Sequence, residues 1–328
     1  MEIPTLPLYG RLGAVLAADS VIGGRLDRLL GGLYVDLGKG DHRGSVFLAG
    51  TGRSGTTWLS DVVNHRGVYR YVFEPFHPGK VEAFAHFRPR QYLRPEDRRE
   101  EFLGPARRVL TGGLRDPWID RFHRGFLPRR RLIKDIRANL LLGWIKANFP
   151  GMPIILLLRH PCAVVASRLA LGWKDNLFET MEQEDLVEDF LSPMETRIRA
   201  ARDDFERHLF LWCIDNYVPL RQFGPGEIHL AFYENLLAHP KEELRRLFAF
   251  LGEDFDDRAY RNLERPSPLS RNEAPENPSV DGWRRQVTGR RLEGAVEILN
   301  LFGLDRVYGE GTMPDPSGAY ALMGGARG

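Results

Sequence analysis

The stretch SVFLAGTGRSGTTW, residues 45–58, decides the fold. Residues 45–49 are mainly apolar and predict a buried strand, and a helix is expected from about residue 55 to 64. The glycines between them let the backbone turn tightly, so that successive N–H groups point at one anion. The helix N-terminus adds its dipole and its free donors. The stretch therefore predicts a strand–loop–helix cradle for an oxyanion carried by a nucleotide.

The side chains of this loop refine the prediction. Residues 50–57, GTGRSGTT, have the spacing of a P-loop, GxxxxGK[ST], but Thr56 stands at the lysine position. Ser54, Thr56 and Thr57 offer hydroxyl donors, and the planar guanidinium of Arg53 suits a tetrahedral oxyanion. A glycine-rich turn without a ligand is the alternative interpretation.

A second candidate anion site follows the apolar run PIILLL at 153–158. This run ends in Arg159 rather than in an acid, so neither the lysine nor the carboxylate of a magnesium-dependent nucleotide hydrolase is present. We expect a site that contacts anions directly, with no metal. Ser167 lies eight residues after Arg159, so both could reach one phosphate beside a helix. The alternative is a surface ion pair and an unrelated serine.

The rest of the chain alternates between strand and helix patterns, which predicts a parallel sheet with right-handed crossovers. We therefore expect an α/β, P-loop-like three-layer fold with a central parallel sheet flanked by helices. Further strands are expected at 131–134, 153–158 and 228–233, and further helices at 138–148, 160–171, 195–221, 239–252 and 291–302.

The predicted domain organisation is simple. Residues 1–40 form an N-terminal extension packed on the domain, and residues 41–310 form one α/β domain. Segments near 70–130 and 172–195 are expected to be insertions that form the acceptor site. Residues 264–290 read as a loop rich in Pro, Asn and Ser, and 311–328 as a flexible tail.

Composition excludes several classes of protein. The 328 residues carry 46 Lys and Arg against 44 Asp and Glu, so net charge gives no support for nucleic-acid binding. Cys162 and Cys213 are expected to stay reduced. No run reaches the ~20 apolar residues of a membrane-spanning helix, and we expect a cytoplasmic protein. The oligomeric state is not readable.

Four motifs together resemble the family of sulfotransferases that use 3′-phosphoadenosine 5′-phosphosulfate (PAPS). They lie in the family's order within residues 45–305: GTGRSGTTW at 50–58, LLLRHPCAVVASRL at 156–169, AFYENLLAHPKEELRRLFAFLG at 231–252 and VDGWRRQVT at 280–288. The resemblance implies PAPS as cofactor and adenosine 3′,5′-diphosphate as product. Two separate anion sites agree with a cofactor that carries two anionic groups.

The resemblance also assigns roles to residues of the cofactor site. It implies that the 5′-phosphosulfate is held by Arg53, Ser54, Gly55, Thr56 and Thr57, and the 3′-phosphate by Arg159 and Ser167. Trp58 and Tyr233 would contact the adenine by ring stacking, with core packing as the alternative for both. Ser279, Arg284 and Arg285 could close over the 3′-phosphate.

The catalytic residues follow a different branch of the family. Cytosolic members use a Lys-x-His pair, but here Lys134 is followed by Asp135 and Ile136. The chain is closer to the carbohydrate and protein-tyrosine type, which implies that Glu74 of VFEPFHP is the general base. Its neighbours Phe73 and Phe76 are expected to raise its pKa. The alternative is a structural carboxylate paired with a nearby arginine.

Three further residues have expected roles near this base. Lys134 and Arg53 are expected to stabilise the charge that develops on the transferred group. Asp135 is expected to orient Lys134 or Arg137. His77 and His160 are weaker acid–base candidates.

The resulting hypothesis is transfer of a sulfuryl group from PAPS to a hydroxyl, less readily an amine, of a saccharide, glycoconjugate or small molecule. A P-loop kinase and a non-catalytic binder of adenosine 3′,5′-diphosphate are the alternatives. The acceptor cleft is expected to use aromatic side chains, among them Tyr69, Tyr71, Phe84, Phe87, Trp118 and Trp173.

Overall fold

The computed structural model describes residues 34–263 and 280–324. Its centre is a five-stranded sheet in the order β2-β3-β1-β4-β5, and every neighbouring pair is parallel. The strands are β1 (Ser45–Gly50), β2 (Tyr69–Phe73), β3 (Arg130–Asp135), β4 (Ile154–Leu158) and β5 (His229–Phe232). Because all strands run the same way, their carboxyl ends meet at one edge of the sheet.

Helices connect these strands. The α-helices are α3 (Thr56–Val63), α4 (Glu100–Leu110), α5 (Leu142–Asn148), α6 (Pro161–Ala170), α7 (Leu177–Thr180), α8 (Glu184–Leu186), α9 (Glu195–Arg199), α10 (Asp204–Gln222), α11 (Tyr233–Ala238), α12 (Pro240–Phe250), α13 (Asp257–Leu263), α14 (Arg290–Leu301) and α15 (Pro316–Leu322). Short 3-10 turns are η1 (His42–Gly44), η2 (Glu82–Phe84), η3 (Asn139–Leu141), η5 (Ser192–Met194), η6 (Gly282–Arg285) and η7 (Leu304–Arg306), and η4 (Val187–Leu191) is a π turn.

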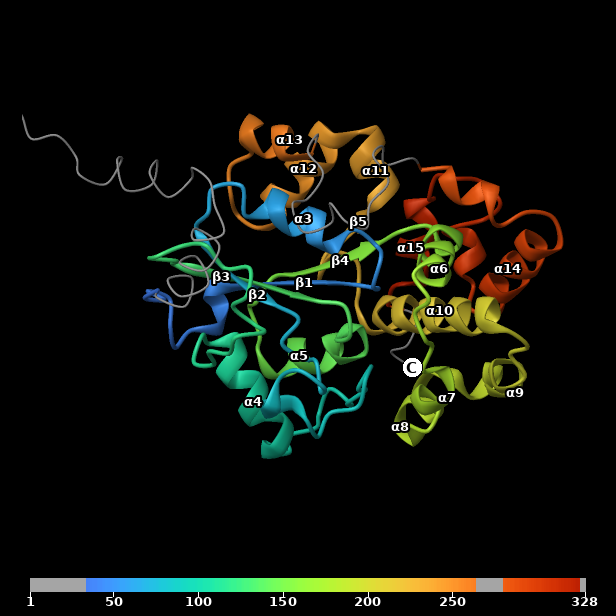
Figure 1. The fold of residues 1–328 in the computed structure, drawn as a ribbon, viewed down its shortest axis with the longest axis horizontal. Helices are drawn as coiled ribbons and strands as arrows, with labels where there is room; N and C mark the ends of the chain where they lie inside the picture. The colour runs from blue at the N-terminus through green and yellow to red at the C-terminus, as the bar shows by residue number, and fades with distance from the viewer. Residues whose placement is uncertain (1–33, 264–279, 325–328) are drawn as a thin grey trace, which may run out of the picture.

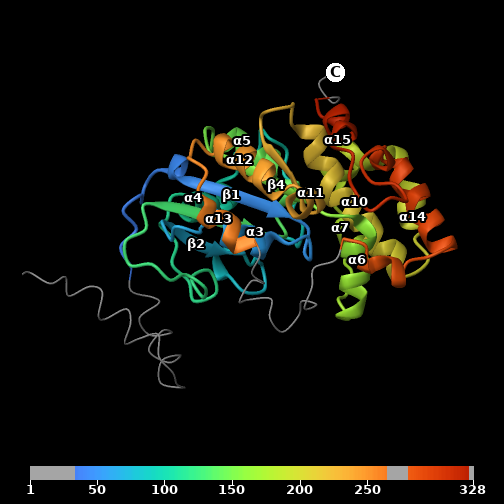
Figure 2. The ribbon, with the colours of Figure 1, turned by 90° about the horizontal axis from the view of Figure 1, so that it is seen from above.

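Two layers of helices enclose the sheet. Helices α3, α11, α12 and α13 cover one face, and α4 and α5 cover the other (Figure 1). Helices α6, α10, α14 and α15 pack together beyond the carboxyl ends of the strands, on the side toward which the β1 arrow points in Figure 2. The strands are buried on both faces, as a covered parallel sheet requires. The predicted P-loop-like three-layer α/β fold is confirmed.

Several predicted elements change in detail. The helix expected over 195–221 is two helices, α9 and α10, because Asp203 caps a new helix by accepting a hydrogen bond from Glu206 N at 2.9 Å. The segment expected as a helix over 138–148 begins with the 3-10 turn η3 before α5. Residue 233, expected in a strand, begins α11 instead.

Strand β2 is absent from the sequence prediction because its second residue is an arginine. Arg70 is 1% exposed in the structure, where Asp120 receives hydrogen bonds from its Nε and Nη2 at 3.0 and 3.1 Å. The Nη2 atom also donates to the carbonyl of Leu114 at 2.6 Å. A charged residue can occupy a buried strand only with partners of this kind, and a partner fifty residues away leaves no local signal.

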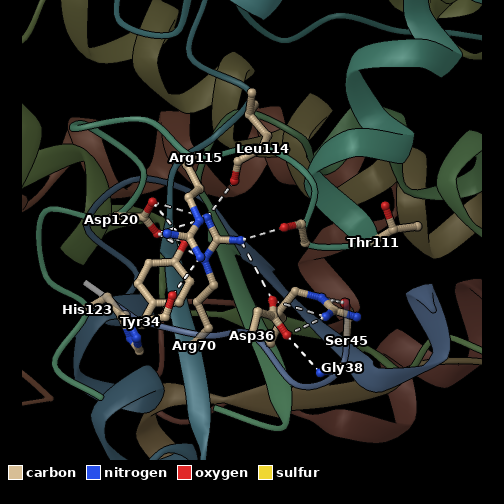
Figure 3. A network of polar contacts seen from close by, with 12 residues as sticks. Tyr34, Asp36, Gly38, Ser45, Arg70, Thr111, Leu114, Arg115, Asp120 and His123 are labelled. Atoms are coloured by element: carbon tan, nitrogen blue, oxygen red, sulfur yellow. Dashed lines mark hydrogen bonds and ion pairs between the residues drawn. The ribbon is translucent and has the colours of Figure 1, made fainter. Parts of the chain in front are cut away.

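Arg70 belongs to a buried polar network at the amino ends of β2 and β3 (Figure 3). Asp36 accepts hydrogen bonds from Nη1 of the buried Arg131 at 3.1 and 3.2 Å and lies 3.8 Å from Arg70 Nη1. Tyr34 donates its hydroxyl to Asp120 at 3.1 Å. This network fastens residues 34–36 to the sheet, at the end opposite the candidate site.

The ends of the described chain are both packed on the domain. Val35 N and Leu37 N donate to the carbonyls of Phe126 and Pro128 at 2.9 Å each, so the described part of the N-terminal extension runs along this loop. The prediction of a flexible tail is wrong for residues 316–322. They form α15, whose buried Ala319 and Leu322 pack beside α10. Residues 1–33 and 325–328 lie outside the described residues.

The cysteines and the helix lengths were also the subject of predictions. Cys162 and Cys213 are both free and buried, as expected. In the two described ranges, none of the helices combines the length and the apolar composition needed to cross a lipid bilayer.

Candidate active site

Residues predicted to form the site lie at the carboxyl ends of all five strands. The cradle follows β1, Glu74 follows β2, Lys134 lies at the end of β3, Arg159 follows β4, and Tyr233 follows β5. In a parallel sheet this edge is where ligands bind, in the crevice beside the point at which strand order reverses. The topology therefore gathers residues that are up to 180 positions apart in the sequence.

The cradle is an open helix N-terminus. Gly55 precedes α3 with φ of 98° and no side chain caps the helix, so the N–H groups of its first turn face the loop. A Cβ atom at Gly55 would lie 2.8 Å from Cδ2 of Tyr233, which only glycine avoids. The hydroxyl groups of Thr51 and Ser54 are buried and have no partner among the described residues. Buried polar atoms without partners fit an anion held in this loop.

Arg53 joins the two predicted anion sites. Its backbone is left-handed, with φ of 79°, and its Nε donates to Ser167 Oγ at 3.0 Å. Arg159 Nη1 donates to the carbonyl of Arg53 at 3.0 Å. Arg53, in the cradle, therefore links Arg159, in the loop before α6, to Ser167 on α6.

The two predicted aromatic residues lie against this group. The guanidinium of Arg159 stands 4.3 Å from the centre of the Tyr233 ring, and Trp58 meets the same ring edge-on at 5.4 Å. Tyr233 is 8% exposed, so most of its surface is already used by protein contacts. Trp58 is half-buried and presents the more accessible ring.

Glu74 lies at the centre of a buried charge cluster. Lys134 Nζ donates to its Oε1 at 2.6 Å and Arg137 Nη1 donates to its Oε2 at 2.5 Å. Glu74 is 6% exposed and has φ of 41°, a conformation that non-glycine residues rarely adopt. Strained residues of this kind concentrate at functional sites. The alternative prediction of a carboxylate paired with an arginine describes this geometry correctly.

The predicted rise in the pKa of Glu74 is wrong. Burial acts to raise the pKa, but the charges and hydrogen bonds of Lys134 and Arg137 outweigh it and lower the pKa below its ordinary value. The apolar neighbours Phe73 and Phe76 are close to Glu74 in the sequence, whereas Lys134 and Arg137 reach the carboxylate only in the folded chain. Glu74 is therefore ionised at neutral pH, and its lowered pKa makes it a weaker base than an ordinary glutamate.

Asp135 supports this cluster through backbone groups. Its Oδ1 accepts from Arg137 N at 2.7 Å and its Oδ2 from Phe76 N at 2.8 Å. It therefore orients Arg137, as expected, and holds together the loops that follow β2 and β3. Complete burial, followed by the nearby charge of Glu74, raises the pKa of Asp135 to about 6.

The two histidine candidates lie in different surroundings. His77 is near the cluster, and burial, reinforced by the charge of Arg137, lowers its pKa to about 4. His160 stacks on Trp283 at 4.2 Å, and its Nδ1 accepts from Cys162 N at the start of α6. Burial lowers the pKa of His160 to about 4 as well. These contacts indicate that His160 stabilises the start of α6.

Arg168 was missed by the sequence analysis. It is 1% exposed beneath the cradle, and its Nε donates to the carbonyl of Gly52 at 3.2 Å. Its Nη1 and Nη2 have no hydrogen-bond partner among the described residues, and the nearest Asp215 oxygen is 4.0 Å away. That carboxylate accepts instead from Arg90 Nε at 2.9 Å. The sequence feature that could have identified Arg168 is its position directly after Ser167, a residue predicted to hold the 3′-phosphate.

Trp173 was expected in the acceptor cleft, and it lies over the same loop. A Cβ atom at Gly52 would lie 2.7 Å from Cζ3 of Trp173, so the indole packs directly on the glycine. The other aromatic residues expected in the cleft divide into two groups. Four are buried in the core, namely Tyr69, Tyr71, Phe84 and Phe87, whereas Trp118 is half-buried beside Glu74.

The remaining predictions concern residues in and next to the motif VDGWRRQVT at 280–288. Arg284 and Arg285 are exposed on η6, and Arg284 contacts the ring of Trp283 at 4.9 Å. Ser279 lies outside the described residues. In the ranges 34–263 and 280–324, no three His, Cys, Asp or Glu side chains form a group that could hold a metal ion.

Comparisons with known proteins show the family to which the chain belongs. A model described as "Sulfotransferase family" matches residues 45–257. The nodulation protein NoeE of Sinorhizobium fredii is 26% identical over 279 residues, which cover 79% of this chain and 64% of that protein. This chain therefore matches less than two thirds of the length of that relative.

Solved structures with related folds show lower identity. The sulfotransferase domain of the olefin synthase from Synechococcus PCC 7002 is 18% identical, covering 79% of this chain and 94% of that domain, with a TM-score of 0.44. Mouse sulfotransferase SULT7A1, solved in complex with PAP, is 16% identical, covering 84% of this chain and 88% of that chain, with a TM-score of 0.45.

Proposed function

Because this chain belongs to the sulfotransferase family, we propose that it transfers a sulfuryl group from PAPS to an acceptor hydroxyl. The observation that carries the proposal is the meeting of three features at one sheet edge. These are the open cradle at Gly55, the cations Arg53 and Arg159 beside it, and the carboxylate of Glu74 held between Lys134 and Arg137.

The cofactor site divides between two groups of residues. The 5′-phosphosulfate would be held by Arg53, Ser54, Gly55, Thr56 and Thr57, and the 3′-phosphate by Arg159 and Ser167. Trp58 offers a ring for the adenine, with Tyr233 supporting it at 5.4 Å. When bound, PAPS supplies an activated sulfuryl group. The partnerless hydroxyl of Ser54 and the uncapped α3 support this fit.

The acceptor side rests on Glu74. As an ionised carboxylate it takes the proton from the acceptor hydroxyl and thereby increases the nucleophilicity of that oxygen. Lys134 and Arg137 hold the two carboxylate oxygens in place. The ammonium group of Lys134 also keeps a positive charge at the end of β3, where it can stabilise negative charge on the transferred group. The acceptor is proposed to be a saccharide, glycoconjugate or small molecule.

A kinase is the weaker candidate. Thr56 occupies the position of the P-loop lysine, and β4 is followed by Arg159 rather than by a magnesium-binding acid. A protein that only binds the nucleotide has no need for a buried, strained Glu74 between two cations.

One experiment separates the three functions. We expect calorimetry to detect adenosine 3′,5′-diphosphate binding without magnesium, and a transfer assay with labelled PAPS to release labelled products from an acceptor panel. Preferential binding of Mg·ATP would overturn the sulfotransferase proposal in favour of a kinase. Tight diphosphate binding with no transfer to any acceptor would favour the non-catalytic binder.

Arg168 provides a test of the cradle itself. We expect Arg168→Met to weaken adenosine 3′,5′-diphosphate binding about tenfold, because the variant loses a charge-assisted hydrogen bond to the loop and a buried positive charge beneath it. Adenosine 3′-monophosphate lacks the 5′-phosphate and so does not use the cradle. Its affinity should therefore change less than about twofold, as expected for a substitution away from the residues that bind it. Calorimetry with both nucleotides measures the difference.

The matched control for this test is Arg207→Met. Arg207 lies on α10 and pairs with Asp175 at 3.0 Å and with Asp204, and among the described residues no hydrogen bond joins it to the cradle loop. Its replacement should leave both affinities unchanged. An equal loss for the two nucleotides in Arg168→Met, with an intact thermal transition, would show that Arg168 does not act through the 5′ cradle.

A further inference from the structure

A surface hollow of about 470 Å³ lies beside the Glu74 cluster. It is lined by Lys80, Asp116, Pro117, Trp118 and Arg121. Trp118 Nε1 donates to the carbonyl of Glu74 at 3.2 Å, and the Trp118 ring meets His77 edge-on at 5.5 Å. The indole is therefore a shared wall between the hollow and the candidate base.

Two cations converge on this wall. The guanidinium of Arg121 lies 4.6 Å from the centre of the Trp118 ring, and it also contacts Phe122 at 4.7 Å and Phe73 at 5.9 Å. Lys80 Nζ lies 5.7 Å from the Trp118 ring. Contact with aromatic faces restrains a cation without neutralising it. Among the residues that the structure describes, no ion pair joins Arg121 or Lys80 to a carboxylate.

The acid in the lining is already engaged. Asp116 Oδ1 accepts hydrogen bonds from Trp118 N at 2.7 Å and Ile119 N at 3.3 Å, so it closes the turn that presents the indole. Two cations against one acid leave the lining with a net positive charge. Phe73 connects this wall to the Glu74 cluster, since its ring centre lies 5.5 Å from that of Trp118 and 4.7 Å from Lys134 Nζ.

On the premise of the proposed function, we propose that this hollow binds an anionic group of the acceptor, and that the acceptor is an acidic saccharide. A carboxylate or sulfate on the sugar would lie between Arg121 and Lys80, while a neighbouring hydroxyl reaches Glu74. The guanidinium of Arg121 can donate two parallel hydrogen bonds to such a group.

The test uses a matched pair of glycosides that differ in one charge. Binding of 4-nitrophenyl β-D-glucuronide and 4-nitrophenyl β-D-glucoside is measured by saturation-transfer NMR and calorimetry, with and without adenosine 3′,5′-diphosphate. We expect the glucuronide to bind about tenfold more tightly, as one charge-assisted contact predicts. The preference should fall as ionic strength rises, because both cations are near solvent.

Variants locate the effect. Arg121→Gln and Lys80→Gln should each reduce the preference, and the double variant should bind the two glycosides within about twofold of each other, as expected once the charged contacts are gone. Arg124→Gln is the matched control, because Arg124 is an exposed arginine of the same loop that does not line the hollow. It should keep the full preference.

Three outcomes would overturn the inference: equal affinities in the unmodified protein, no detectable glucuronide binding, or a preference that survives in the double variant. These outcomes are distinct from failure of the proposed function. A protein that binds adenosine 3′,5′-diphosphate and transfers label but ignores the glycoside charge loses this inference alone. A protein that does not bind the nucleotide loses the proposed function first.

Discussion

Glu74→Gln is expected to lower turnover about a thousandfold while affinity for adenosine 3′,5′-diphosphate stays within about twofold. Glutamine has nearly the same shape but cannot take a proton from the acceptor. It also leaves the charges of Lys134 and Arg137 without their shared carboxylate, which lies 2.6 and 2.5 Å from them. The proposed nucleotide contacts come from the segments that follow β1, β4 and β5, so they are not removed with it.

The pH dependence follows from the direction of the pKa shift. Because the pKa of Glu74 is lowered in the folded protein, its ionised form persists at neutral and mildly acidic pH. The contribution of Glu74 to stability is present above its unfolded pKa of about 4.3 and is lost as pH falls through the lower folded value. We therefore expect titration of Glu74 to cause no fall in turnover between pH 8 and about pH 5. A fall centred near pH 6 would instead report protonation of Asp135, whose pKa is about 6.

Steady-state kinetics with calorimetry on the same preparations checks this prediction. Glu182→Gln is the matched control, since Glu182 is an exposed glutamate paired with Arg88 at 3.6 Å. It should retain full turnover. Near-normal turnover of Glu74→Gln with acceptor and PAPS saturating would remove Glu74 as the base and leave it a structural carboxylate.

Asp36→Ala is expected to lower the free energy of unfolding by about 3–5 kcal/mol, the cost of leaving the buried charge of Arg131 without its carboxylate partner. Asp36 pairs with Arg131, which is 0% exposed, and lies 3.8 Å from Arg70, which is 1% exposed. Neither guanidinium can reach water without opening the amino ends of β2 and β3. The damage should appear in chemical denaturation as a lower midpoint.

The control is an ion pair without burial. Glu188 receives a hydrogen bond from Arg94 at 2.6 Å, but its side chain is 75% exposed. Glu188→Ala should therefore cost less than about 1 kcal/mol. If Asp36→Ala costs as little as Glu188→Ala, the buried network does not stabilise the fold in the way its geometry indicates. Nucleotide affinity should be unchanged in folded Asp36→Ala protein, because the network lies at the opposite end of the sheet.

The parts of the fold predicted from the sequence were those with local signals. Apolar runs at 45–49 and 153–158 predicted β1 and β4, and proline followed by helical spacing predicted α6. Strand β2 had no such signal, because the charge of Arg70 is tolerated only through Asp120, fifty residues later. Burial of charge depends on tertiary partners, which spacing does not reveal.

The candidate site also has features that the sequence predicts and features that depend on tertiary contacts. The cradle and Arg159 were predictable because backbone geometry and strand ends place them. The direction of the Glu74 pKa shift was not, since it depends on Lys134 and Arg137 arriving from the next strand. Arg168 was missed because helical spacing alone does not distinguish a buried cation from an exposed one.

The strand order β2-β3-β1-β4-β5 separates the residues proposed to bind the nucleotide from those proposed to bind the acceptor. Residues proposed to hold the nucleotide come from the centre and the β5 side, whereas Glu74, Trp118 and Arg121 come from the connection between β2 and β3 at the opposite side. Insertions or exchanges within that single connection can alter which acceptor is chosen while the nucleotide half is inherited intact. Acceptor choice and cofactor use can therefore evolve as separate modules of one sheet.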